Sequence, residues 1–279
     1  MTPRPRDYRA GEFKFTSTQS GRKASRDDLV AVLDHGIPGT YMPSFKLLAE
    51  RDKRAVVEYV RWLAMRGEVE QAFGSLLNDE WSAEYLEEFE GDPEGRDEFL
   101  AEFADYAGEY LAEDFLTEAE LPADKWVAAE LENAVLIPET PRTPMSAESV
   151  ARGRQLYLAE KSKCASCHGE SGHGNGPSTM DFLNLADGPA PERGLYDSWG
   201  QPIKPRDLTR GQFRGGRRPV DIYRRIAAGV KGTPMPALAT ALEPDEIWDL
   251  VNYVLAVGED PKAGQEPGGE AAADEVAMN

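Results

Sequence analysis

The chain has 279 residues, of which 41% are hydrophobic, and this is enough for one or two folded domains. Its formal net charge of −19 argues against nucleic-acid binding, because a phosphate backbone would be repelled rather than neutralised. No apolar run approaches the ~18 residues that a membrane span needs, and the first residues lack the apolar core of a signal peptide. Two cysteines cannot make a disulfide framework, so their close spacing indicates a local chemical site.

The N-terminal region repeats a later part of the chain. Residues 5–13 (PRDYRAGEF) resemble 205–213 (PRDLTRGQF), 36–43 (GIPGTYMP) resemble 229–236 (GVKGTPMP), and 56–60 (VVEYV) resemble 250–254 (LVNYV). Three matched blocks in one order are too many for chance. Residues 1–67 are therefore predicted to correspond to the second half of a domain expected at residues 146–258.

The region between the two copies is strongly acidic. Residues 68–143 contain 23 Asp and Glu but three basic residues, an excess close to the net charge of the whole chain. Aromatic residues recur there at helix-compatible spacings, so residues 68–145 are predicted to be an acidic helical insertion with a proline-rich junction at its end. A solvated charged face is the plain interpretation, and a docking surface for a basic partner is the alternative.

Helix signals dominate residues 146–258. Ser146 or Ser149 is suited to cap a first helix, and Pro219 and Pro244 are suited to begin two later ones. After Pro244 the apolar residues recur three and four positions apart, as on one buried helix face. The predicted fold class is therefore all-α. Residues 259–279, rich in Gly and Ala with scattered acids, are expected to be a disordered tail.

Cys164, Cys167 and His168 form the sequence Cys-Ala-Ser-Cys-His, which is the attachment signature of a c-type haem. Two thiols at this spacing reach the two vinyl groups of one porphyrin, and the adjacent histidine supplies an imidazole to the iron. Two lesser alternatives are a zinc site, which wants four ligands, and a thiol–disulfide site, which would come with a βαβ pattern that the chain lacks.

A low-spin haem iron needs a sixth ligand, and Met235 is the best candidate. It lies between two prolines that favour an extended loop able to hold a thioether, and a soft sulfur ligand stabilises ferrous iron and raises the potential. A methionine that merely fills a gap in the core is the plain alternative. Met180 competes for the same role, but it follows His168 closely in a loop expected on the proximal side.

These motifs resemble those of class I cytochrome c, and the whole chain resembles two-domain, dihaem c-type cytochromes of bacteria. The resemblance implies that Cys164 and Cys167 form the thioethers and that His168 and Met235 are the axial ligands. It also implies that the carbonyl of Pro177 orients the proximal imidazole. The glycine and tyrosine at 153 and 157 correspond to the first-helix residues that pack against the last helix.

The first copy departs from this pattern because it lacks the Cys-x-x-Cys-His half. Met42 then stands as an orphan candidate for a distal ligand. One haem c per chain is predicted, with a second expected only if the true start of the gene lies upstream of Met1 and encodes another attachment motif. We favour the upstream start, against a remnant half-domain that rests on the rest of the chain. Haem attachment in this family implies a periplasmic or otherwise extracytoplasmic location.

A basic cluster occurs in the otherwise acidic chain. It comprises Lys204, Arg206, Arg210, Arg214, Arg217, Arg218, Arg224 and Arg225. One interpretation is that Arg206 and Arg210 neutralise the haem propionates while others face an acidic redox partner; the other is a solvated surface that balances nearby acids.

The predicted function is one-electron transfer to redox protein partners through a haem edge, without turnover of a substrate. A haem-relay subunit of a larger oxidoreductase is the alternative. A dihaem peroxidase-like enzyme is less favoured, because it needs a second haem and an iron with an open position. Docking is expected through either the acidic insertion or the basic cluster at 204–225.

Overall fold

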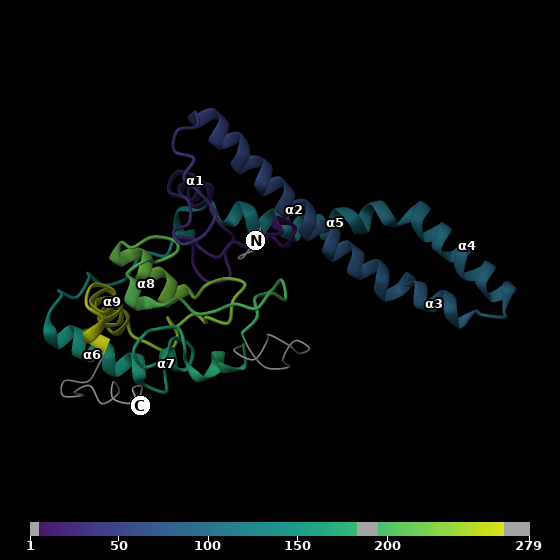
Figure 1. Cartoon of the computed structure of the whole chain (residues 1–279). Coiled ribbons are helices and arrows are strands. Elements are labelled where there is room, and N and C mark those ends of the chain that lie inside the picture. Colours follow the sequence, from purple (N-terminus) through teal and green to yellow (C-terminus); the bar gives the residue numbers. More distant parts are fainter. Residues whose placement is uncertain (1–5, 183–194, 265–279) are drawn as a thin grey trace, which may run out of the picture. The chain divides into compact units, whose positions relative to one another are not determined.

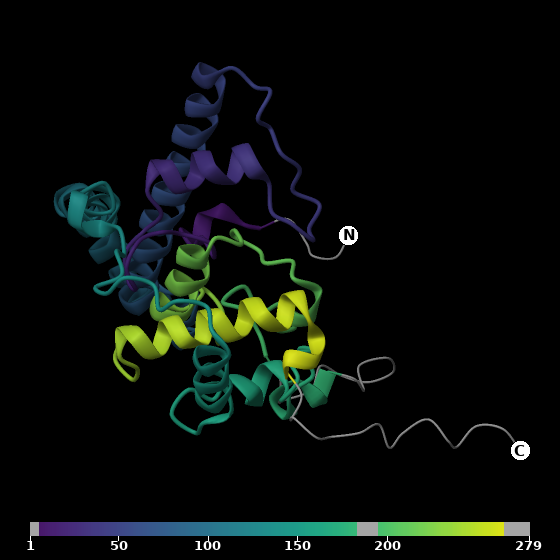
Figure 2. The same ribbon diagram turned by 90° about the vertical axis from the view of Figure 1, so that its left-hand side faces the viewer.

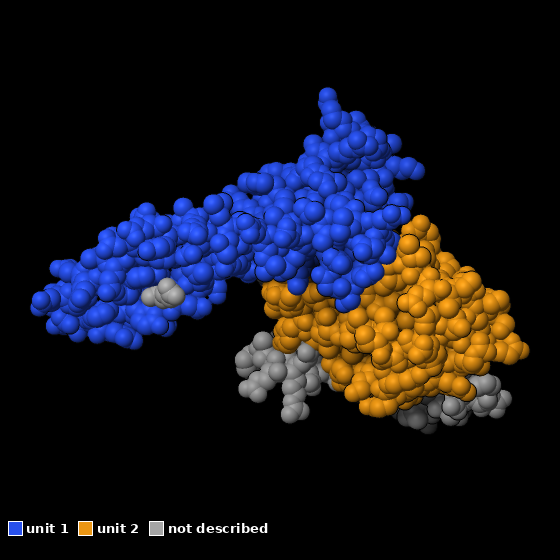
Figure 3. All heavy atoms as spheres, turned by 180° about the vertical axis from the view of Figure 1, so that it is seen from behind, with its two compact units in different colours: residues 1–35, 44–135 blue, residues 36–43, 136–279 orange. Residues whose placement is uncertain are grey.

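The computed structural model describes residues 6–182 and 195–264, and within these residues it contains helices and loops but no β-strand. The chain divides into two compact units, which Figure 3 colours blue and orange. Unit 1 comprises residues 1–35 and 44–135, and unit 2 comprises residues 36–43 and 136–279. The predicted all-α class is confirmed. Among the described residues, no helix is both long enough and apolar enough to cross a membrane.

Unit 1 is built around one long helix. Its helices are α1 (Arg26–His35), α2 (Glu50–Trp81), α3 (Ala83–Glu88), α4 (Pro93–Glu109) and α5 (Leu111–Ala128). Helix α2 runs through the predicted domain boundary at residue 67, since apolar residues keep helical spacing beyond it. His35 is the last residue of α1, and its ring Nδ1 lies 2.9 Å from the carbonyl oxygen of Ala31.

The acidic insertion forms the outer part of unit 1, where α2, α3, α4 and α5 make an extended helical arm (Figure 1). The ring of Trp81 packs within 5.5 Å of Phe99, Phe103 and Tyr106, measured between ring centroids. This aromatic stripe lies inside the arm while the carboxylates face water. Carboxylates that stay in water lower the stability of the folded arm very little, so a narrow apolar stripe is enough to hold these helices together.

Unit 2 contains the second copy. Its helices are α6 (Ala147–Leu158), α7 (Cys164–His168), α8 (Pro219–Ala228) and α9 (Pro244–Glu259). Ser146 is the residue that caps α6, through a bond from the N–H of Ser149 to its hydroxyl. Helix α9 supplies more of the buried core than any other element of unit 2, and α6 crosses it (Figure 2).

The crossing of α6 and α9 is close because Gly153 sits at the contact. A Cβ at this position would lie 2.1 Å from the carbonyl oxygen of Asp249 and 2.7 Å from the Cβ of Tyr253. Only glycine allows this approach. The ring of Tyr157, one turn later, packs 5.0 Å from that of Tyr253, and both are fully buried. The predicted packing of Gly153 and Tyr157 against the last helix is confirmed.

The proline-rich junction before α6 is bound to α9. The indole N–H of Trp248 donates to the carbonyl of Thr140, and the amide of Asn252 donates to the carbonyl of Thr143. Arg142 in turn donates to the side-chain oxygen of Asn252 at 2.8 Å. The predicted proline-rich junction is therefore a segment that packs along α9.

The repeat recurs as matching hydrogen bonds around the two methionine loops. In the first copy the N–H of Ile37 donates to the carbonyl of Met42 at 3.1 Å, and in the second the N–H of Val230 donates to the carbonyl of Met235 at 3.2 Å. The hydroxyl of the threonine two residues before each methionine accepts from the methionine N–H, at 3.1 and 3.3 Å. The two loops thus have the same local conformation.

The blocks that precede these loops also match. The short 3-10 helices η1 (Tyr8–Ala10) and η4 (Leu208–Arg210) each begin after an aspartate whose side chain accepts from the N–H two residues on. Each ends at a left-handed glycine, with φ of 64° at Gly11 and 60° at Gly211. The repeat inferred from the sequence is therefore a structural duplication.

Candidate functional site

The attachment motif forms its own short helix, α7. Cys164, Cys167 and His168 occupy its first, fourth and fifth positions, and residues three and four apart share one face of a helix. Both cysteines are free thiols in the structure. Burial raises the pKa of the Cys164 thiol, so this thiol is protonated at neutral pH. The motif therefore presents two thiols and an imidazole from one turn of helix.

The imidazole of His168 is held by a backbone oxygen. Its Nδ1 lies 3.0 Å from the carbonyl oxygen of Arg206, and burial lowers the pKa of the ring. A neutral ring that donates from Nδ1 leaves Nε2 with the free lone pair that a metal ligand needs. The resemblance gave the orienting carbonyl to Pro177, whereas the structure gives it to Arg206. The reason is local: Gly174 packs against the carbonyl of Pro205, which brings this segment beside the motif.

Helix α6 supports the motif from the other side. The hydroxyl of Tyr157 donates to the carbonyl of Gly169, the residue that follows His168, at 2.6 Å. The nearby ring of Tyr253 has its hydroxyl buried without a hydrogen-bond partner among the described residues. Burial raises the pKa of both tyrosines, and both lie near the thiol of Cys164. The crossing of α6 and α9 is thus joined directly to the attachment helix.

Met235 shares a core with the attachment motif. Its side chain packs against the same apolar cluster as Cys164 and Ala165. The loop that carries it folds tightly over Gly229, where a Cβ would lie 2.7 Å from the carbonyl oxygen of Met235. The side chain of Met180, the competing candidate, lies outside the described residues.

The arginines predicted for the propionates are in unlike surroundings. The side chain of Arg210 is 74% exposed and forms an ion pair with Asp207. Arg206 donates to the backbone and side chain of Gln212 and has no carboxylate within ion-pair distance among the described residues. Arg206 therefore keeps its charge available, and Arg210 is largely neutralised.

Arg214 was not singled out by the sequence, yet the structure places this half-buried cation beside Arg206. Its Nε has no hydrogen-bond partner among the described residues, and its other contact is a 3.5 Å bond to the carbonyl of Gly39. Burial, followed by the neighbouring charge of Arg206, lowers the pKa of Arg214. Two adjacent cations with no acid between them suit an anionic group. Only its nearness to Arg206 in the sequence hinted at this role.

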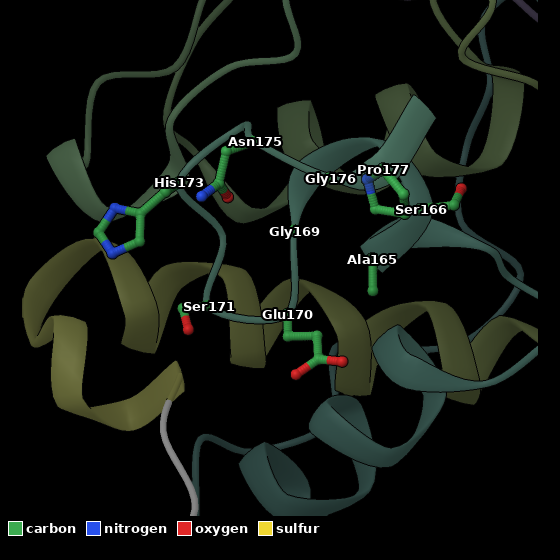
Figure 4. A pocket seen from close by; sticks show the side chains of 9 residues that line it. All are labelled: Ala165, Ser166, Gly169, Glu170, Ser171, His173, Asn175, Gly176 and Pro177. Carbon is green, nitrogen blue, oxygen red and sulfur yellow. The ribbon is translucent and has the colours of Figure 1, made fainter. Parts of the chain in front are cut away.

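A pocket of about 430 Å³ adjoins the attachment helix and is shown in Figure 4. It is lined by Ala165, Ser166, Gly169, Glu170, Ser171, His173, Asn175, Gly176 and Pro177. None of the predicted thioether or axial residues lines it. The side chain of His173 is 52% exposed, and its Nδ1 lies 3.7 Å from the carboxylate of Asp207. This pocket is a surface hollow behind α7.

Comparison with known proteins agrees with this geometry. The family model described as Cytochrome c matches residues 150–258. The chain carries a cytochrome c domain. Among curated proteins, none matches the chain. A chain of the reducing HAO-like protein complex Kustc0457/Kustc0458 of Kuenenia stuttgartiensis is similar in structure, with a TM-score of 0.60 and 25% sequence identity. The match covers 92% of this chain and 83% of that one.

The cytochrome c family implies a covalently bound haem c and haem-based electron transfer. The residues present fit that group on three counts: paired thiols with an imidazole on one turn, a methionine in the same core, and a half-buried arginine with no carboxylate partner among the described residues. The predicted cytochrome c-like character of residues 146–258 is confirmed by the family model over residues 150–258.

Proposed function

We propose that this protein transfers single electrons through one haem c held in residues 146–258. The haem supplies the redox couple, and the chain supplies its attachment, its axial ligands and its surroundings. Cys164 and Cys167 would form the two thioethers, and His168 and Met235 would supply the ligands of the iron. The observation that carries the proposal is the single turn α7, which presents both thiols and a backbone-held imidazole.

Each supporting residue then has a defined task. The carbonyl of Arg206 holds the imidazole through Nδ1, and this bond increases the donor strength of the ring. The guanidinium groups of Arg206 and Arg214 bind the propionates, a task for which Arg214 takes the place given to Arg210 by the sequence. The soft sulfur of Met235 favours the ferrous state and raises the potential. Pro177 remains next to the motif without this bonding role.

A relay within a larger assembly is the second candidate. The similar chain belongs to a protein complex, and the match covers nearly the whole of this chain, the acidic arm included. In this version the arm binds a neighbouring subunit and the haem passes electrons onward. As a cytochrome c domain, it takes up its haem outside the cytoplasm, so we place the protein in the periplasm or an equivalent compartment.

The test is the haem content of protein made with its maturation machinery. We expect one haem per chain, retained through acid–acetone extraction and partly lost in Cys164→Ala. The reduced pyridine-haem spectrum gives the stoichiometry. Complete extraction from the wild type, or two haems per chain, would contradict the proposal. Electron exchange that slows with salt indicates a diffusing carrier, and copurification in a fixed ratio indicates the relay.

A further inference from the structure

Residues 36–43, the methionine loop of the first copy, belong to unit 2, although the helices before and after them belong to unit 1 (Figure 3). The base of this loop is closed by two hydrogen bonds. The N–H of Phe45 donates to the carbonyl of Leu33 at 2.7 Å, and the hydroxyl of Ser44 donates to the carbonyl of Asp34. The loop is therefore a short excursion with joined ends, and its tip is a defined part of unit 2.

Hydrogen bonds within the loop fix the conformation of its tip. The N–H and the hydroxyl of Thr40 both donate to the carbonyl of Ile37, at 3.1 and 2.8 Å. Gly39 lies inside this turn with φ of 72°, in the left-handed region that favours glycine. The main chain at Gly39 is thus held by the bonds on either side of it.

Gly39 packs against the guanidinium of Arg206. A Cβ on this glycine would lie 2.7 Å from Nη2 and 3.0 Å from Nη1 of that arginine, so only a hydrogen atom fits there. The same guanidinium donates from Nε and Nη2 to the main-chain and side-chain oxygens of Gln212, at 2.8 and 3.0 Å. Gln212 therefore holds the guanidinium of Arg206 by hydrogen bonds, and Gly39 limits its position by direct contact.

Gly39 also contacts the second cation of this pair. Its carbonyl oxygen accepts a long hydrogen bond of 3.5 Å from Nη2 of Arg214, the half-buried arginine whose pKa is lowered by burial and by the charge of Arg206. In the second copy the corresponding glycine, Gly232, likewise accepts at its carbonyl, from the N–H of Ser198 at 3.1 Å. The tip of this loop is thus a contact point in both copies, and in the first copy its partners are two arginines.

We propose that the loop of residues 36–43 is part of the haem site of the second copy, where Gly39 positions the guanidinium groups of Arg206 and Arg214 for the haem propionates. This inference rests on the proposed function, because the propionates belong to the haem proposed for residues 146–258. Gly39 is a positioning residue, since it acts through the two arginines. The main chain of the loop performs this task, so the side chain of Met42 is not required for it.

The experiment measures the reduction potential of the full-length, haem-loaded protein as a function of pH, by spectroelectrochemistry. Gly39→Ala should displace the guanidinium of Arg206, which is the far end of a flexible side chain, so the fold and the attached haem should be kept. A cation beside the haem disfavours the ferric state, so its displacement should lower the potential. A propionate that loses a nearby cation has a raised pKa, so the pH-dependent part of the curve should move to higher pH.

Gly21→Ala is the matched control. Gly21 is also left-handed, with φ of 77°, but a Cβ there would meet nothing within 4 Å. The substitution therefore imposes a similar backbone strain without a contact to either arginine, and it should give the curve of the wild type. Equal curves for Gly39→Ala and Gly21→Ala would overturn the inference.

A second background tests whether Gly39 acts through Arg206. In Arg206→Gln, the further change Gly39→Ala should add no shift of the potential, because the cation that it displaces is already gone. The same shift in both backgrounds would also overturn the inference. If Gly39→Ala fails to fold, Gly39→Asn replaces it, since asparagine tolerates the left-handed region and carries the same Cβ. Haem content is measured first: a chain without haem contradicts the proposed function, whereas a haem-loaded Gly39→Ala with an unshifted potential contradicts this inference alone.

Discussion

Gly153→Ala provides the sharpest test of how the fold holds the haem motif. The new Cβ would lie 2.1 Å from the carbonyl oxygen of Asp249 and 2.7 Å from the Cβ of Tyr253. Neither atom is the far end of a flexible side chain, so α6 and α9 must separate by about 1 Å to reach ordinary contact. A gap of that size forfeits a quarter to a half of the dispersion energy across the contact.

The magnitude follows from two opposing effects. Overpacking of a core contact costs roughly 1–3 kcal/mol, and a collision with backbone belongs at the upper end. Alanine in a helix regains about 1 kcal/mol relative to glycine. The free energy of unfolding should therefore fall by about 2 kcal/mol. For a domain of this size, the midpoint of thermal unfolding should fall by roughly 10 °C.

The assay is equilibrium unfolding in guanidinium chloride, followed by haem absorbance and by far-ultraviolet circular dichroism. Gly74→Ala is the control, because Gly74 lies within α2 and a Cβ there would meet nothing within 4 Å. This control should gain up to about 1 kcal/mol of stability. If Gly153→Ala unfolds at or above the denaturant concentration of the wild type while the control behaves as expected, the close crossing does not limit this fold.

Met235→Ala should keep the haem attached but remove the sulfur–iron charge-transfer band of the ferric spectrum. The reduction potential should fall, and ferrous iron should bind carbon monoxide. Met42→Ala is the control and should change none of these properties. Retention of the band in Met235→Ala would show that another residue is the ligand. Arg214→Gln should shift the potential more than Arg210→Gln in protein-film voltammetry, because Arg210 is already paired with an acid. Equal shifts would remove Arg214 from the propionate site. Tyr157→Phe should cost about 0.5–1.5 kcal/mol of unfolding free energy, because the carbonyl of Gly169 still accepts from the N–H of Gly172. A larger loss in denaturant titration would show that the hydroxyl stabilises the fold by more than this one hydrogen bond.

Local patterns made the second copy predictable. The attachment motif, the prolines that begin α8 and α9, and the spacing of apolar residues along α9 all act over a few residues, so the sequence alone contains them. The methionine loop was predictable for another reason: it occurs twice. The loop conformation requires glycine, threonine and methionine in a fixed order, so the same residues recur in both copies.

The missed features depend on partners that are distant in sequence. The proline-rich junction had the composition of a linker, and only Trp248 and Asn252 of α9 make it a packed segment. Arg210 and Arg214 are both arginines of the same basic cluster, so the sequence does not distinguish them, whereas their different burial in the structure does. The predicted boundary at residue 67 follows the end of the repeat, and α2 runs across it because its apolar residues keep helical spacing. Pro122 lies within α5 and would have suggested a break there, although the helix continues through it.

Arg206 contributes to the site in two independent ways. Its main-chain carbonyl oxygen accepts the hydrogen bond from His168, and its side chain carries a positive charge. A main-chain oxygen is present whatever side chain occupies position 206, so substitutions there leave the partner of the imidazole in place. The same residue places its guanidinium beside Arg214, and that charge disappears with any neutral replacement. Under the proposed function, we expect natural variants at this position to change the reduction potential through charge while the hydrogen bond to the imidazole is kept. Homologues that differ at position 206 would form a graded series of potentials on an unchanged ligand set.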